Sequence, residues 1–150
     1  EGDFTYYANR EGLTVAGAFS VLDTKITKKL VPTNDVIVGT DLAFAPKFQG
    51  NLRVKQERPL TNGMMSHILV QYTFSDKSYS DVMEVNKAQQ DSYSVLDLRV
   101  GISNDDWNAE LYIDNVTDKR AAISNTFVFD RQRISYIRPM TIGIRYKKIF

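Results

Sequence analysis

The side chains best suited to catalysis are few in this sequence, and their spacing does not favour it. The 150 residues include one histidine, His67, and no cysteine, which excludes thiolate catalysis and cysteine-based metal sites. His67 follows Ser66, and both residue types serve in serine hydrolases. Adjacent residues of a strand point to opposite faces, however, so these two cannot form a nucleophile–base pair. We expect no catalytic residue, and we interpret His67 as structural or interior-facing.

Two adjacent carboxylates, Asp105 and Asp106, raise the question of a cation site. In the short sequence NDD they are more typical of a tight turn, because a calcium site needs about six or more oxygen ligands. We predict neither a metal site nor a cofactor. The 19 basic and 18 acidic residues give a net charge of +1, which also argues against a nucleic-acid partner.

Arginine side chains offer a different chemistry, the binding of an anionic ligand through charge-assisted hydrogen bonds. Arg131 and Arg133 lie in FDRQR, within the longest expected connection, where they are candidates for ligand or phosphate contact; the alternative is a solvated loop. Arg53 and Arg99 belong to a ladder of charges that could guide an anion, although we favour a mutually paired, hydrated surface. The ladder comprises Lys47, Arg53, Lys55, Asp97, Arg99, Glu110, Asp114, Arg145 and Lys147.

Strands must position these side chains, because the dominant pattern of the sequence has a period of two. In MMSHILVQYTFS, for example, Ile68, Val70 and Tyr72 fall on one face of a strand, and the polar residues His67, Gln71 and Thr73 fall on the other. No segment has a convincing helical period. The pattern predicts seven strands, at about residues 2–8, 12–28, 46–57, 64–79, 92–103, 107–117 and 138–150.

The connections between these strands alternate in length. Short ones, at NREG, RPLTNG and NDD, are each followed by a long one, around residues 29–45, 80–91 and 118–137 respectively. Consecutive antiparallel strands emerge at opposite ends of a sheet. The order therefore predicts an all-β, antiparallel up-and-down meander, with trimmed turns at one end and long loops at the other.

Strand length and aromatic placement favour a transmembrane β-barrel over a soluble sheet. The complete strands have about 11 residues or more, the length that a tilted strand needs to cross a bilayer, whereas strands of soluble sandwiches have about 5–6. A soluble antiparallel β-sandwich that binds carbohydrate or protein is the alternative. Aromatic residues gather near strand ends, as interfacial girdles require: Tyr6, Tyr7, Phe44, Phe48, Tyr72, Phe74, Tyr79, Tyr93, Trp107, Tyr146 and Phe150.

The odd number of strands indicates part of a larger barrel. Bacterial single-chain barrels have an even number of strands, whereas seven are expected here, and the N-terminus has no signal-peptide pattern. We expect residues 1–150 to be the C-terminal part of a large transmembrane β-barrel, with earlier strands upstream.

Three segments resemble TonB-dependent outer-membrane receptors. LAFAPKFQGNL is similar to the start of a strand after an extracellular loop, AELYIDNVTDKRA to the penultimate strand and its exit, and RPMTIGIRYKKIF to the terminal strand. The sequence departs from the family pattern at Val116 and Thr117, where leucine and an aromatic residue are common, and at Lys148, where an apolar residue is usual.

The resemblance implies a barrel of about 22 strands closed by an N-terminal plug. It implies a non-enzymatic receptor of the bacterial outer membrane, energised by the TonB complex through the plug region. The imported ligand would be a ferric siderophore or other iron complex, with cobalamin and glycans as alternatives. Further partners would be outer-membrane lipid and the barrel-assembly machinery, which reads a final aromatic strand, here with Tyr146 and Phe150. A passive porin-like pore is a further alternative.

Overall fold

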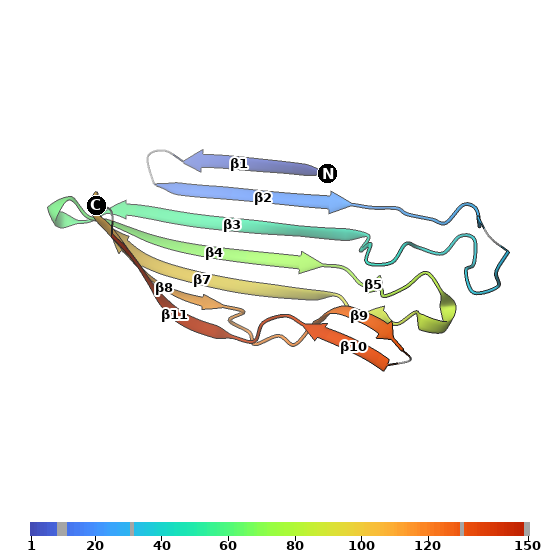
Figure 1. Ribbon diagram of the computed structural model, residues 1–150. Coiled ribbons are helices and arrows are strands. Elements are labelled where there is room, and N and C mark those ends of the chain that lie inside the picture. The colour runs from blue at the N-terminus through green and yellow to red at the C-terminus, as the bar shows by residue number, and fades with distance from the viewer. Residues whose placement is uncertain (9–11, 31, 130, 149–150) are drawn as a thin grey trace.

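The computed structural model describes residues 1–8, 12–30, 32–129 and 131–148, and strands dominate this part of the chain. Seven strands form one antiparallel sheet in the order β1-β2-β3-β4-β7-β8-β11 (Figure 1). The predicted all-β meander of seven strands is thus confirmed. The bounds are Gly2–Ala8 (β1), Leu13–Val21 (β2), Phe48–Pro59 (β3), Met65–Ser75 (β4), Tyr93–Ser103 (β7), Trp107–Asp114 (β8) and Thr141–Lys148 (β11).

The short and long connections lie at opposite ends of the sheet, as their order in the sequence predicted. Figure 1 shows the turns from β3 to β4 and from β7 to β8 at the left of the view. The long segments 22–47, 76–92 and 115–140 lie together at the right. We refer to these two sides as the short-turn end and the long-loop end.

The second strand is shorter than predicted, because a strand lasts only as long as its partner. β2 ends at Val21 and not near residue 28, and Leu22 donates one further backbone hydrogen bond to the Lys47 carbonyl, at 2.9 Å. The partner strand β3 starts only at Phe48, directly opposite Val21. Alternating polarity beyond that point therefore has no neighbouring strand to pair with.

Three other predicted strands are also trimmed. β4 ends at Ser75 instead of residue 79, and β11 starts at Thr141 instead of residue 138. β8 ends at Asp114 instead of residue 117, because Asn115 takes a positive φ of 54°, which breaks the extended backbone.

The segment 118–137, predicted to be a loop, contains a β-hairpin. Its strands are β9 (Ala122–Val128) and β10 (Arg131–Tyr136), which pair in a separate two-stranded sheet. A two-residue hairpin connection needs positive φ, which Gly or Asn usually supplies. Here Phe129 adopts a φ of 49°, so the sequence carries no ordinary turn signal at this position.

The remaining elements are short. β5 (Ser78–Tyr79) and β6 (Gln89–Gln90) pair with each other at the long-loop end. Two single 3-10 turns are η1 (Thr61–Gly63) and η2 (Glu84–Asn86). No helix within the described ranges is long and apolar enough to cross a membrane.

The register of the sheet sorts its side chains onto two faces. Directly opposed residues of antiparallel strands share a face, so pairs such as Leu52 with Tyr72 and Leu111 with Ile144 lie on the same side. We call this side the apolar face. It includes Phe4, Tyr6, Val15, Phe19, Leu52, Val54, Ile68, Val70, Tyr72, Leu98, Val100, Leu111, Ile113, Ile142, Ile144 and Tyr146.

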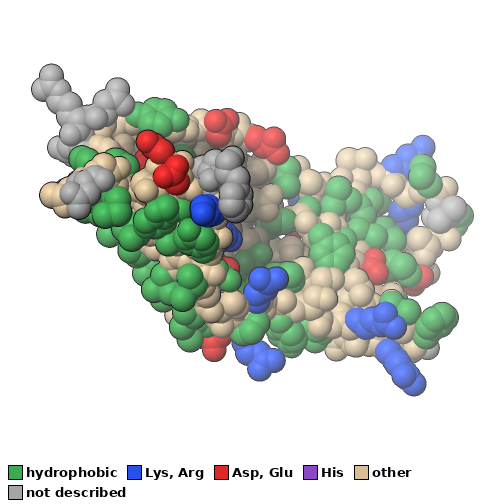
Figure 2. Space-filling view, turned by 60° about the vertical axis from the view of Figure 1, so that its left-hand side comes forward, with side chains coloured by type: hydrophobic (Ala, Val, Ile, Leu, Met, Phe, Trp, Pro, Cys, Tyr) green, Lys and Arg blue, Asp and Glu red, His purple; other side chains and the backbone are tan. Residues whose placement is uncertain are grey.

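The apolar face is not covered by a second layer. Among the described residues, Pro46 and Ala121 are the only buried apolar side chains. Ile142 and Ile144 of β11 are 62% and 81% exposed. Figure 2 accordingly shows hydrophobic side chains on the surface of the molecule. A chain that buries so few apolar side chains within itself needs an apolar surrounding to stabilise this face.

Candidate functional site

The opposite side of the sheet, the polar face, carries charged and amide side chains. Strand register places Arg53 opposite Gln71, Gln71 opposite Asp97, and Glu110 opposite Arg145. These residues come from consecutive strands of the meander, so their side chains form one continuous surface.

Glu110 is the centre of the charge arrangement on the polar face. Its Oε1 atom lies 3.2 Å from Arg145 Nη1 and 3.9 Å from Arg99 Nη1, and its Oε2 atom lies 3.2 Å from His67 Nε2. The Glu110 side chain is 13% exposed. Three nitrogen-bearing side chains therefore surround one mostly buried carboxylate, which sequence analysis noted only as a member of the charge ladder.

The two arginines predicted for this surface have different partners. Arg99 Nη2 also lies 3.6 Å from Asp114 Oδ1, so its guanidinium is balanced by two carboxylates. Arg53 donates hydrogen bonds to Gln71 Oε1 at 3.1 and 3.4 Å. An amide carries no charge, so this contact orients Arg53 without neutralising it.

His67 reaches Glu110 by lying over Gly101. A Cβ atom at position 101 would lie 2.5 Å from His67 Cε1, so this position requires glycine while the ring stays in place. Ser66 instead donates its hydroxyl to the Arg58 carbonyl, at 3.1 Å. The described structure thus contains no Ser66–His67 dyad.

Arg131 and Arg133 lie outside the polar face, on the hairpin β9–β10. Both are exposed, and they stand opposite Val128 and Thr126. The four candidate ligand-binding arginines are therefore placed in two groups: Arg53 and Arg99 on the polar face, and the other two in the hairpin at the long-loop end (Figure 1).

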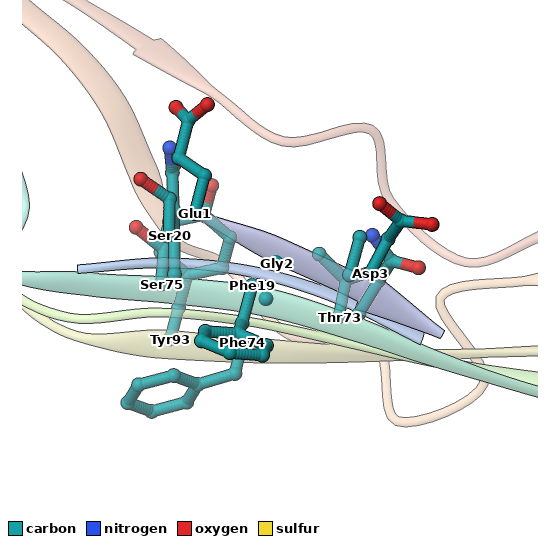
Figure 3. A pocket seen from close by; sticks show the side chains of 13 residues that line it. Glu1, Gly2, Asp3, Phe19, Ser20, Thr73, Phe74, Ser75 and Tyr93 are labelled. Carbon is teal, nitrogen blue, oxygen red and sulfur yellow. The ribbon is translucent and has the colours of Figure 1, made fainter. Parts of the chain in front are cut away.

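Two adjoining cavities at the long-loop end were not anticipated from the sequence. The larger, of about 510 Å³, is shown in Figure 3, in which Ser20 and Ser75 rise from one side of the sheet. The smaller, of about 180 Å³, lies under the long loops and shares Gln49, Ser75 and Tyr93 with the larger. Neither cavity is lined by Lys or Arg from the part of the chain that the structure describes.

Asn115 is a buried connector at the same end, and sequence analysis gave it no role. It is 3% exposed, and its side chain bonds the backbone of Lys119 in both directions and donates to the Arg138 carbonyl at 2.9 Å. Its own N–H donates to Asp97 Oδ1 at 2.8 Å. The motif AELYIDNVTDKRA thus has a physical reason, because this asparagine joins the exit of β8 to the approach of β11.

The acidic pair in NDD sits in turn geometry. Asn104 Oδ1 accepts hydrogen bonds from the backbone N–H groups of Asp106 and Trp107, at 3.0 and 2.9 Å. Within the described ranges, no group of three or more acidic or histidine side chains is arranged to hold a metal ion.

Of the two residues predicted to form an assembly signal, the structure describes one. Tyr146 lies on the apolar face, 61% exposed, and its ring stacks on Trp107 with centroids 6.3 Å apart. Phe150 lies outside the described residues.

The connection between β2 and β3 contains an exposed ion pair between Lys25 and Asp41. The side-chain hydrogen bond between them lowers the pKa of Asp41 and raises that of Lys25. Backbone hydrogen bonds between Ile26 and the segment 39–40 run alongside, at 2.8 and 2.9 Å.

Comparison with known proteins agrees with this architecture. The family model described as "TonB dependent receptor-like, beta-barrel" matches residues 1–116. Among solved structures, the ferric yersiniabactin uptake receptor FyuA from Yersinia pestis aligns with a TM-score of 0.73 at 18% identity, covering 96% of this chain and 21% of that chain. The siderophore receptor PiuA from Acinetobacter baumannii aligns with a TM-score of 0.71 at 17% identity, covering 95% and 20%.

These alignments show the fold, and the chain spans about a fifth of the length of either receptor. No curated protein sequence matches the chain. The family match covers more than half of the residues, and the sheet has the meander order of such a barrel. The chain belongs to the TonB-dependent receptor β-barrel family.

Proposed function

We propose that this chain forms part of the wall and the extracellular loops of a TonB-energised outer-membrane receptor that imports an iron complex, such as a ferric siderophore. One observation carries the proposal: the sheet is a single layer with an exposed apolar face and an ion-paired polar face. In a barrel the apolar face would contact lipid, and the polar face would line the lumen.

The placement of the connections supports this orientation. Barrels of the outer membrane have short periplasmic turns and long extracellular loops. The short-turn end would then face the periplasm, and the long-loop end, with both cavities and the hairpin β9–β10, would face the medium from which cargo arrives.

We place the chain at the C-terminal end of the barrel, because RPMTIGIRYKKIF resembles a terminal strand. Its partners would be outer-membrane lipid, the barrel-assembly machinery reading Tyr146 and Phe150, and the TonB complex acting through an upstream plug. We propose the iron cargo by analogy with FyuA and PiuA, which are described as a ferric yersiniabactin uptake receptor and a siderophore receptor.

Transport of radiolabelled iron tests the function. The intact receptor would be expressed in bacteria that lack their own siderophore receptors, with and without TonB, and a panel of ferric siderophores supplied. We expect accumulation of one complex only in cells with both the receptor and TonB. Receptor-dependent accumulation that persists without TonB would indicate a passive pore, and absence of accumulation for every iron complex would overturn the iron cargo.

A further inference from the structure

Gln90 is a buried side chain with one polar end unused. It is 5% exposed, lies in β6 and lines the smaller cavity. Its Oε1 atom accepts a hydrogen bond from Ser78 Oγ at 2.9 Å, whereas its Nε2 atom has no hydrogen-bond partner. Exchanging the two amide atoms would leave the oxygen without a partner instead, because Ser78 satisfies only one end.

A second unsatisfied side-chain atom belongs to a residue of the larger, adjoining cavity. Ser20 Oγ is buried without a hydrogen-bond partner, and Ser20 lines the larger cavity. Buried polar groups are normally paired, so each exception needs an explanation. Within the described ranges both exceptions lie along two cavities that meet at Gln49, Ser75 and Tyr93, which points to a ligand that completes the pairing.

The lining of the smaller cavity fits hydroxyl groups. Asp76 and Asp91 each use one carboxylate oxygen for a local bond, at 2.8 and 2.9 Å, and keep a second oxygen as an acceptor. A ligand hydroxyl can accept from the Gln90 amide and donate to such a carboxylate at the same time. Phe44 and Tyr93 supply apolar surface against which a ring can pack.

The charges that line the smaller cavity and its volume restrict the class of ligand further. An anionic group would lie beside two aspartates with no Lys or Arg from the described chain among the lining residues. At about 30 Å³ per water molecule, 180 Å³ corresponds to the volume of roughly six waters, enough for one small ring but not for a whole iron chelate.

We propose that this cavity is a subsite for a neutral, hydroxyl-bearing ring of the ligand, held by hydrogen bonds from Gln90 and to Asp76 and Asp91. The inference rests on the proposed function, because the ring would reach the cavity from the long-loop end as part of the cargo. It adds a ligand chemistry that the ion-paired polar face does not provide.

Saturation-transfer NMR on the intact receptor in detergent micelles tests the subsite. The probes are methyl α-D-glucopyranoside, a neutral hydroxylated ring, and gluconate, an anionic polyol. We expect the neutral probe to bind more tightly than gluconate. Gln90→Leu should weaken its binding by about three- to tenfold, the loss expected for one neutral hydrogen bond. The matched control Gln132→Leu alters an exposed glutamine of β10 that lines neither cavity, and it should leave binding unchanged.

A second variant guards against misfolding: Gln90→Met removes the amide, keeps an unbranched side chain of similar length and adds no charge at this buried position, and it should show the same loss. Three results would overturn the subsite. They are equal affinity of the parent and these variants for the neutral probe, tighter binding of gluconate than of the neutral probe, and no binding of either probe because water alone fills the cavity. Iron uptake in the cells with and without TonB, as described under the proposed function, separates the two proposals. Uptake without sugar binding refutes the subsite alone, whereas sugar binding without TonB-dependent uptake refutes the proposed function alone.

Discussion

At Asn115 three constraints meet in one residue. The backbone φ is 54°, the side chain is almost fully buried, and its amide bonds the backbone of two separate segments. Asparagine tolerates left-handed φ better than most residues and also carries a donor and an acceptor. Glycine would tolerate this backbone conformation but lacks the amide, and alanine lacks both properties.

Replacing Asn115 by alanine should lower the free energy of unfolding by about 2–4 kcal/mol. Two contributions add to this loss. The first is the cost of leaving backbone groups of Lys119 and Arg138 without hydrogen-bond partners, and the second is about 1 kcal/mol of strain at positive φ. Asn115→Gly removes the same hydrogen bonds but not the favourable backbone conformation, so it should cost about 1 kcal/mol less. Denaturant titration of the micelle-bound protein measures both variants. An alanine variant as stable as the parent would show that these bonds contribute little.

At the scale of an element, the hairpin β9–β10 carries two exposed arginines, Arg131 and Arg133, at the long-loop end. We predict that the double variant Arg131→Gln, Arg133→Gln weakens capture of an anionic iron complex about tenfold, mainly through a slower association rate. The difference should shrink as salt is raised from low to physiological concentration, because exposed charges are screened. Stopped-flow binding at two ionic strengths measures the effect. Lys28→Gln, an exposed cation in another long loop, is the control, and equal slowing by this single change would argue against a specific hairpin contact.

The ion pair in the β2–β3 connection should make the stability of the neighbouring backbone hydrogen bonds in that loop depend on pH. The pKa of Asp41 is lowered from its ordinary value of 3.8, so its contribution is present above that value and is lost as pH falls through the lowered one. The pKa of Lys25 is raised from 10.5, so its contribution is present below 10.5 and is lost as pH rises through the raised value. Protection of the Ile26 and Gly39 amides in hydrogen exchange should follow this window, after correction for intrinsic exchange rates. Asp41→Asn should make the corrected protection independent of pH.

For the whole molecule, the decisive property is a sheet without a core of its own. We predict that purified residues 1–150 aggregate in plain buffer and acquire β-structure in detergent micelles, because the exposed apolar face must contact either another chain or detergent. Circular dichroism with size-exclusion chromatography measures both states. A monomeric, cooperatively folded protein in buffer alone would contradict the membrane assignment and favour the soluble sandwich.

The sheet was predictable from sequence because alternation is local, whereas the sites depend on long-range geometry. Period two located the seven strands, and connection lengths gave their order. The hairpin β9–β10 was missed because Phe129 takes a left-handed turn conformation without a glycine or asparagine signal. The convergence of His67, Arg99 and Arg145 on Glu110 depends on register, which alternation alone does not specify.

The smaller cavity was likewise invisible in the sequence. Its walls come from the β2–β3 connection, the segment 76–92, the start of β9 and the long-loop ends of β3, β4 and β7, which are separated along the chain. Single-sequence patterns report which residues alternate, not which loops meet.

The lack of an internal core also determines which amino-acid substitutions this protein can tolerate over evolutionary time. In a packed core each side chain must match its neighbours in shape, and even a lost methylene is felt. Where a sheet faces fluid hydrocarbon on one side, many apolar side chains can replace one another. The backbone hydrogen bonds between the strands do not depend on which apolar side chain is present. We therefore expect the sequences of such walls to drift quickly while the strand order persists, and a TM-score of 0.73 at 18% identity fits this expectation.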